Sequence, residues 1–206
     1  PSAWSPFQHR VFAVMWTAAL LGNIGTWMRD VGAGWLMTTL SPSATFVALV
    51  QVAGTLPIFL LALPAGTLAD LVNRRRLLIG VNLLLAAVAL SLGLITQLGG
   101  MTPWLLLAAL TVGGIGSALA TPVLQSLTPL QVPRPELRAA IALNSMGFNV
   151  ARAIGPALGG LVIAAVSVPL VFFLDAFSYL LVIAALLWWK AAATPASTGA
   201  PEPFGG

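Results

Sequence analysis

The sequence has no cysteine, a single histidine and few charges, which make up 7% of its residues. Without cysteine, and with one histidine, it can form neither a disulfide scaffold nor a zinc site with Cys and His ligands. Ordinary soluble domains carry about 25% charged residues, so this chain cannot cover a water-facing surface. The sequence also lacks a Gly-x-x-x-x-Gly-Lys-Ser/Thr phosphate loop, which excludes ATP hydrolysis through such a loop. We expect no cofactor.

Apolar runs dominate what is present. The chain is 59% hydrophobic, with a mean hydropathy of +0.98. A helix needs about 20 apolar residues to cross the hydrocarbon core of a bilayer. We therefore predict an all-α membrane protein whose first partner is the lipid bilayer. The six expected transmembrane helices lie near residues 12–36, 45–68, 77–98, 104–127, 139–166 and 170–189.

The segments at the two ends differ from this six-span domain, which we expect over residues 10–190. Residues 1–9 are predicted to form a cytoplasmic or interfacial segment. Residues 191–206 are small, polar or Pro/Gly-rich and bury too little to fold alone. They are expected to be a disordered cytoplasmic tail or the start of an interdomain linker.

The cations lie in alternate gaps between the runs. Arg10 precedes the first run, Arg74–Arg76 and Arg134 lie in later gaps, and Lys190 follows the last run. The intervening gaps, near residues 41–43, 99–102 and 167–169, carry no Lys or Arg. The positive-inside rule then puts both termini in the cytoplasm of a plasma (inner) membrane. Because these cations sit beside lipid headgroups, the net charge of +4 does not indicate a nucleic-acid partner.

A weak internal repeat also runs through the sequence. Gly-Asn-Ile-Gly-Thr at residues 22–26 resembles Gly-Gly-Ile-Gly-Ser at residues 113–117. The same shift in residue number aligns the third run with the sixth. Three spans per copy is an odd number, so the second copy must be inverted in the membrane. Nested three-plus-three inverted repeats are found in one half of certain secondary transporters.

The most distinctive motif lies between the second and third runs and reads Gly-Thr-Leu-Ala-Asp-Leu-Val-Asn-Arg-Arg-Arg over residues 66–76. Gly66 permits close helix approach. Asp70 can pair with a guanidinium group or a helix N-terminus, and Asn73 tolerates a left-handed turn. The simpler interpretation is an arginine cluster that sets topology, with an incidental aspartate.

This motif resembles the signature of the major facilitator superfamily between its second and third spans, Gly-x-Leu-Ala-Asp-Arg-x-Gly-Arg-Arg. Leu71 replaces a basic residue of that signature, and Asn73 replaces its glycine. In the superfamily the loop forms part of the inner gate. The resemblance therefore implies gate or conformational-switch roles for Gly66, Asp70, Arg74 and Arg75.

A second stretch, residues 133–160, resembles the drug and siderophore exporter branch of that superfamily, to which the enterobactin exporter belongs. Its Gly-Pro-x-x-Gly-Gly element is similar to a span-five motif of antiporters. Gly155 and Gly159 form a face for tight helix packing, and Pro156 is expected to bend the helix. Helix packing alone would also explain this element, which comprises Gly155, Pro156, Gly159 and Gly160.

Charged residues inside the runs are the next signal: Arg29, Asp30, Arg152 and Asp175 fall in the middle or outer half of the bilayer. An unpaired charge there costs about 2.5–3.5 kcal/mol. We therefore expect Arg29 or Arg152 to pair with Asp30 or Asp175 beside a central cavity. Three interpretations stay open: a structural ion pair, Arg29 snorkelling to the outer interface, and proton coupling through Asp30 or Asp175.

Polar residues at helical spacing mark one face of the first run and one of the fifth. Asn23, Trp27 and Asp30 share the first face, and Asn149 and Arg152 share the second. A polar stripe belongs against protein or water rather than lipid. The residues predicted to line a cavity for cargo or protons are Asn23, Trp27, Asp30, Asn149, Arg152 and Asp175, with Gln51 and Gln125 as weaker candidates.

These patterns together predict an all-α, six-span bundle that resembles the N-terminal six-helix half of a major facilitator transporter. Its expected function is export of a small amphipathic molecule by alternating access, coupled to protons. Superfamily members carry two such halves, so we expect a truncated or split product, or a half that pairs with another half or with a second copy. A non-transporting subunit or inactive remnant is the alternative. A second alternative is a membrane enzyme that uses Asp30 or Asp175 as an acid or base. The two carboxylates are scattered in the sequence, which argues against it, and we predict that the protein is not an enzyme.

Overall fold

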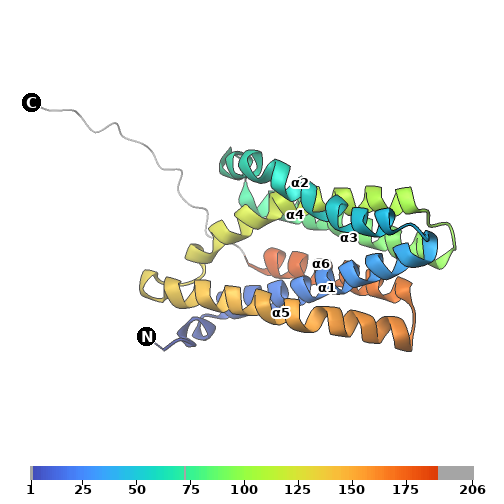
Figure 1. Cartoon of the computed structure of the whole chain (residues 1–206). Helices are drawn as coiled ribbons and strands as arrows, with labels where there is room; N and C mark the ends of the chain where they lie inside the picture. The colour runs from blue at the N-terminus through green and yellow to red at the C-terminus, as the bar shows by residue number, and fades with distance from the viewer. Residues whose placement is uncertain (1, 72, 190–206) are drawn as a thin grey trace, which may run out of the picture.

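In the described part of the chain, six long helices make up the bundle, and all run along one axis (Figure 1). The computed structural model describes residues 2–71 and 73–189, with the backbone alone for residues 62–71. Each helix is long and apolar enough to cross a membrane. This confirms the predicted all-α fold. The helices are α1 (Arg10–Leu40), α2 (Ala44–Leu71), α3 (Arg74–Gln97), α4 (Pro103–Leu127), α5 (Leu137–Ala165) and α6 (Val168–Trp188).

Polar side chains and one glycine fix several helix ends. Asn73 does not adopt the left-handed conformation that its residue type tolerates, because its φ is −65°. Its side-chain oxygen instead accepts the N–H of Arg76 at 3.1 Å, which caps the N-terminus of α3. Gly99 ends α3 with a φ of +73°, and the N–H of Gly100 donates to the carbonyl of Ile95. Arg74, expected just outside the third span, is the first residue of α3.

The helix pairings follow an internal symmetry. Helix α1 packs on α5 and α6, α4 packs on α2 and α3, and α3 packs on α6. Exchanging the first three helices with the last three leaves this set of pairs unchanged, as an inverted repeat requires. The two glycine segments occupy matching places, since Gly25 of α1 faces α6 and Gly116 of α4 faces α3.

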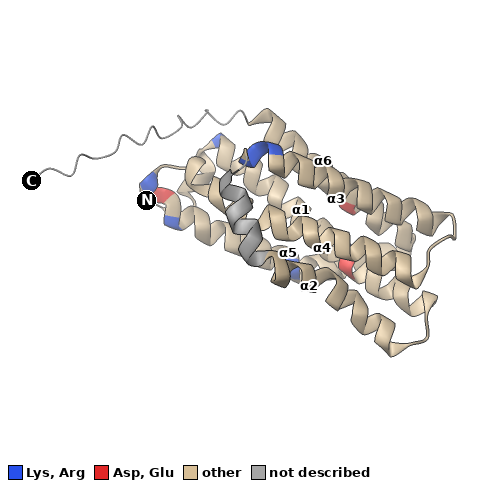
Figure 2. Cartoon of the chain, turned by 90° about the horizontal axis from the view of Figure 1, so that it is seen from above, with Lys and Arg blue, Asp and Glu red and all other residues tan. Residues whose placement is uncertain are grey.

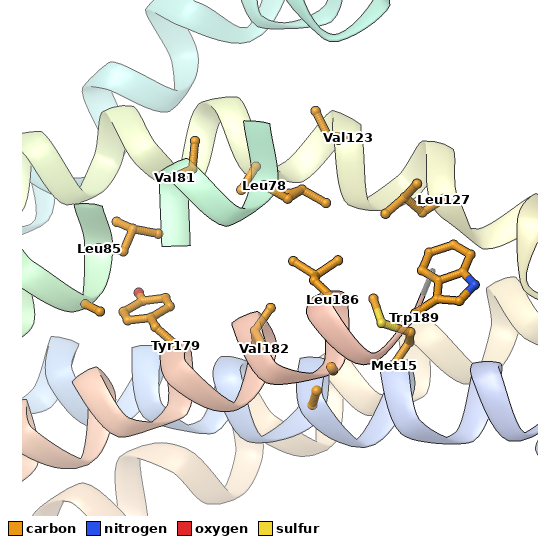
Figure 3. Packing of buried hydrophobic residues seen from close by; sticks show 14 of the residues in the cluster. Met15, Leu78, Val81, Leu85, Val123, Leu127, Tyr179, Val182, Leu186 and Trp189 are labelled. Atoms are coloured by element: carbon orange, nitrogen blue, oxygen red, sulfur yellow. The ribbon is translucent and has the colours of Figure 1, made fainter. Parts of the chain in front are cut away.

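The largest apolar core lies among α1, α3, α4 and α6 (Figure 3). Leu78, Val123 and Leu186 are completely buried there. Large apolar side chains also cover the outside, with Phe59 81% exposed and Leu161 64% exposed. Such an exterior suits lipid, which makes no demand for polar groups.

Most cations gather at the end of the bundle where the N-terminus lies (Figure 2). This end also carries the short 3-10 helices η1 (Ser5–Gln8), η2 (Thr128–Leu130) and η3 (Arg134–Glu136). His9 Nε2 lies 3.0 Å from Glu136 Oε2, which ties the N-terminal segment to the α4–α5 connection. The predicted tail, residues 191–206, and Lys190 lie outside the described residues.

Candidate functional site

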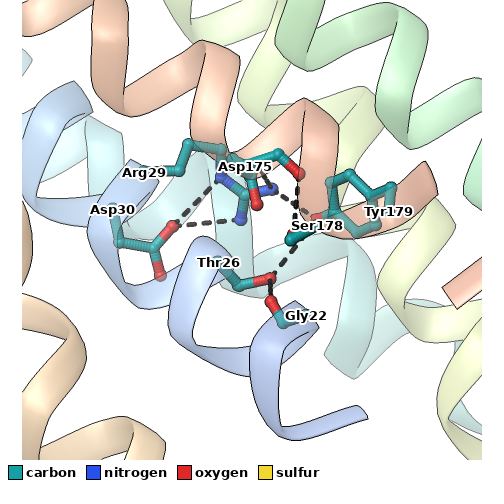
Figure 4. Close-up of polar contacts among 7 residues, drawn as sticks. All are labelled: Gly22, Thr26, Arg29, Asp30, Asp175, Ser178 and Tyr179. Atoms are coloured by element: carbon teal, nitrogen blue, oxygen red, sulfur yellow. Dashed lines mark hydrogen bonds and ion pairs between the residues drawn. The ribbon is translucent and has the colours of Figure 1, made fainter. Parts of the chain in front are cut away.

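Arg29 joins α1 to α6 through a buried polar cluster (Figure 4). Its Nη2 lies 3.0 Å from Asp30 Oδ1, and its Nη1 lies 3.5 Å from Asp175 Oδ2. The same Nη1 donates to the hydroxyl of Tyr179 at 3.0 Å. The Arg29 side chain is 11% exposed, Asp175 is fully buried, and the Asp30 side chain is 46% exposed. The arginine therefore points into the bundle, and the snorkelling interpretation is wrong.

Local helix geometry builds the rest of the cluster. Asp175 and Tyr179 are four residues apart, so both side chains emerge on the same face of α6. Thr26 donates to the carbonyl of Gly22 at 3.1 Å, and its hydroxyl lies 3.3 Å from that of Tyr179. Gly25 lets the helices approach closely: a methyl group there would lie 2.5 Å from Ser178 Oγ.

Asp175 keeps one oxygen without a partner. Among the described residues, no donor reaches its Oδ1, although Oδ2 accepts from Arg29. A buried carboxylate oxygen without a hydrogen bond is costly. A proton could therefore bind to Asp175 Oδ1 without breaking a hydrogen bond that this oxygen already accepts.

A small cavity of about 120 Å³, lined by both polar and apolar residues, opens beside the cluster between α1, α2 and α4. Arg29 and Asp30 line it from α1, Gln51 and Thr55 from α2, and Ser117 from α4. Asp30 is thus the acidic member of the cluster that a molecule in this cavity meets. In the described part of the chain, no group of three His, Asp or Glu side chains is placed to hold a metal ion.

Within the part of the chain that the structure describes, Arg152 makes no ion pair, contrary to one form of the sequence hypothesis. Its guanidinium carbon lies 5.9 Å from the centroid of the Trp27 ring, and that ring also contacts Phe148 edge to face. Asn149 and Arg152 are exposed on α5. Arg152 lies over Trp27, and Asp30, one helical turn further along α1, lines the cavity. The polar stripe of α5, formed by Asn149 and Arg152, is therefore close to the cavity.

The glycine element of α5 lies against α1. A methyl group on Gly155 would lie 2.6 Å from Trp27 Cβ, and one on Gly159 would lie 3.0 Å from Met28 Cα. Gly160 faces open space, so it takes no part in this contact. Helix α5 continues through Pro156 from Leu137 to Ala165.

The motif between α2 and α3 is described only in part. Gly66 and Asp70 lie in residues 62–71, for which the structure describes the backbone alone, so the Asp70 side chain is outside the described part. Arg75 reaches α6, where its Nε donates to the carbonyl of Leu186 at 2.7 Å and its Nη2 donates to that of Leu187 at 3.0 Å. Its charge therefore caps the last carbonyls of α6 and opposes the negative end of the helix dipole.

Sequence reasoning missed Thr26, Ser178 and Tyr179. One signal for Tyr179 was available, since it is the single tyrosine of the chain and lies one helical turn after Asp175. Thr26 and Ser178 are small hydroxyl residues that bond to their own helices. Nothing in the sequence distinguishes them from other serines and threonines in apolar runs.

Comparison with known proteins adds a family and several relatives. A family model for transmembrane secretion effectors matches residues 1–205. The staphyloferrin A transporter of Staphylococcus aureus is 27% identical over 81% of this chain and 42% of its own length. Macrolide efflux protein A of Streptococcus pyogenes is 24% identical over 73% of this chain and 37% of its own. The multidrug efflux pump Tap of Mycolicibacterium fortuitum is 28% identical over 71% of this chain and 37% of its own.

Proposed function

Because the chain belongs to the transmembrane secretion effector family of the major facilitator superfamily, we propose that it is one six-helix half of a transporter that exports a small amphipathic molecule by alternating access. The chain spans 42% and 37% of the length of two relatives it matches. The proposal therefore includes a second six-helix half, either a further segment or a second copy of this chain.

Exposed polar side chains at membrane depth carry this proposal. Asp30 is 46% exposed, Asn149 and Arg152 are exposed on α5, and Gln51 and Thr55 are exposed on α2. Such groups are costly against lipid. A second half that encloses them, with water or cargo between, would remove that cost. Helices α2 and α5 are also the least buried of the six spans.

Cargo recognition is assigned to the side chains around the cavity and the α5 stripe. Trp27 with Arg152 presents an aromatic face and a cation, while Asn23, Asn149 and Gln51 offer amides. This mixture fits a molecule with apolar and polar parts. The names of the relatives, which include a siderophore transporter and a macrolide efflux protein, support the same class of cargo.

Proton coupling is assigned to the Arg29 cluster. A proton on Asp30 would weaken its pair with Arg29, while Arg29 keeps its contacts with Asp175 and Tyr179 on α6. The partly exposed Asp30 is the group that exchanges protons with the cavity. The gate is assigned to Gly66, Asp70, Arg74 and Arg75. The contact of Arg75 with the end of α6 would couple that loop to the same helix.

The proposed setting is the plasma membrane, crossed six times with both termini in the cytoplasm. The basic end of the bundle supports this orientation, because short cytoplasmic loops accumulate Arg and Lys. Transport, rather than catalysis, is the proposed activity.

Efflux from proteoliposomes tests the proposal. The chain is reconstituted alone and with a second six-helix half, and loaded with a macrolide, staphyloferrin A or a fluorescent amphipathic dye. We expect export driven by a pH gradient, and about a tenfold or greater loss in Asp30→Asn, in line with removal of an acid–base group. Glu136→Gln, a carboxylate outside the spans, is the matched control and should transport normally.

Two results would contradict parts of the proposal. Undiminished proton-driven export by Asp30→Asn would remove that residue from coupling. If no cargo moves in either reconstitution, the alternative of a non-transporting membrane subunit or inactive remnant is favoured.

A further inference from the structure

An apolar groove of about 500 Å³ lies between α1 and α6, near the basic end of the bundle. Its floor and walls come from small side chains, Ala13 and Thr17 on α1 and Ala184 on α6, with Leu21 and Leu181 deeper in. Trp188 closes it toward the end of α6. Its volume falls in the range of small-molecule sites, about 300–1,000 Å³.

The groove faces lipid rather than the proposed transport path. On a helix with 3.6 residues per turn, Leu21 in the groove and Asn23 on the predicted cavity face are about 200° apart. Helices α5 and α6 meet only weakly, and α1 lies between them (Figure 1). The surface of α1 opposite the cavity is therefore open to the bilayer.

The depth of the groove matches one leaflet. Its α1 side runs from Ala13 to Leu21, and its α6 side runs from Leu181 to Trp188. At 1.5 Å per residue, these segments are about 11–12 Å long. Half of the hydrocarbon core is about 15 Å thick. The groove therefore extends from the interface at the basic end toward the middle of the bilayer.

A positive charge is fixed at the mouth of the groove. The guanidinium carbon of the exposed Arg10 lies 5.3 Å from the centroid of the Trp188 ring, within reach of a cation–π interaction. Among the described residues, the nearby Glu136 pairs with His9, and no carboxylate pairs with Arg10. Arg75 caps the carbonyls of Leu186 and Leu187. The end of α6 therefore does not repel an anion at this place.

We propose that this groove is a binding site for an anionic phospholipid of the leaflet on the basic side. One acyl chain would lie in the groove, and the headgroup phosphate would meet Arg10 above Trp188. The apolar lining suits the chain, and the uncompensated guanidinium group selects the charge of the headgroup. The site is separate from the cavity and from the transport path.

Native mass spectrometry of the full 206-residue chain, titrated with phosphatidylglycerol or phosphatidylcholine of identical acyl chains, tests this assignment. One arginine near a headgroup predicts about a fivefold preference for phosphatidylglycerol. Arg10→Gln should bring the two lipids to equal affinity. Arg134→Gln, which removes an exposed charge from the α4–α5 connection, should keep the preference.

Filling the groove tests its role separately from the charge. Ala184→Phe should lose binding of both lipids, and Thr17→Phe, from the opposite wall, provides a second variant if the first does not fold. Ala87→Phe, at an exposed alanine of α3 outside the groove, should bind like the unchanged chain.

Three results would overturn the assignment: equal affinity for the two lipids in the unchanged chain, a preference that survives Arg10→Gln, or lipid binding that survives both groove-filling variants. Soluble glycerol phosphate provides a further arm. It should not displace the lipid at equal concentration, and displacement would show an anion site that does not use the groove.

Discussion

A single guanidinium group holds the polar cluster together at the level of residues. Arg29 contacts both aspartates and the tyrosine hydroxyl, whereas Asp175 has Arg29 as its ion-pair partner. Asp175 is fully buried and already has one oxygen without a donor. The ionised form of Asp175 is therefore stabilised by Arg29 alone among the ion pairs described, whereas Arg29 is also stabilised by Asp30.

We predict that Arg29→Gln lowers the free energy of unfolding by about 3–5 kcal/mol, because removal of one partner leaves a buried charge uncompensated. Asp175→Asn should cost less, since Arg29 keeps Asp30 at 3.0 Å. Thermal or denaturant unfolding in detergent measures both.

Arg152→Gln is the control for the loss of an arginine at membrane depth. Arg152 is exposed and makes no ion pair among the described residues. Its loss removes the contact with the Trp27 ring and should change stability by no more than about 1 kcal/mol. Equal losses for Arg29→Gln and Arg152→Gln would mean that the pairing with Asp175 contributes little.

Close contact between α1 and α5 determines how these helices sit at the level of elements. Gly155 and Gly159 bring the backbone of α5 against Trp27 and Met28. Without a strong hydrophobic drive between helices in lipid, association depends on such van der Waals packing. The same contact places the Arg152 side chain over the Trp27 ring.

Gly159→Ala should therefore destabilise the chain by about 1–3 kcal/mol, since the added methyl group meets the Met28 backbone, which cannot rotate away as a side chain can. Gly160→Ala, one residue later, faces open space. It should be neutral or stabilising by up to about 1 kcal/mol, because alanine favours the helix. Unfolding of the two variants under identical conditions gives the comparison, and equal stability would rule out tight packing at Gly159.

Much of the architecture could be predicted at the level of the whole molecule, because lipid imposes the same requirement on every span. The six runs became α1 to α6 with ends displaced by only a few residues, and the repeat reappears in the helix pairings. The identity of the ion pairs could not be predicted. A change of one residue in register rotates a side chain by about 100°, and only packing selects Arg29 over Arg152.

Contacts between distant segments show the same limit. Arg75 and Leu186 are 111 positions apart, and no local pattern in the sequence predicts that this arginine bonds to the end of α6. The residue type of Asn73 indicated that a left-handed turn is tolerated there, but it did not predict that the side chain would cap the N-terminus of α3.

The absence of cysteine makes the orientation directly measurable, since an introduced cysteine is the one thiol in the chain. Leu98→Cys lies at the end of the bundle poor in cations, and Gln8→Cys lies at the basic end; both positions are exposed. A membrane-impermeant maleimide should label Leu98→Cys in intact cells and Gln8→Cys only after the cells are opened. The reverse pattern would invert the proposed topology.

The charges at membrane depth also have a consequence for the response to voltage. The two arginines and two aspartates of α1, α5 and α6 cancel formally, so a rocking movement of this half transfers no net charge through the electric field. Each elementary charge moved across 100 mV changes the energy by about 2.3 kcal/mol. A current during turnover should therefore report the proton, the cargo or the other half, and not the displacement of these helices.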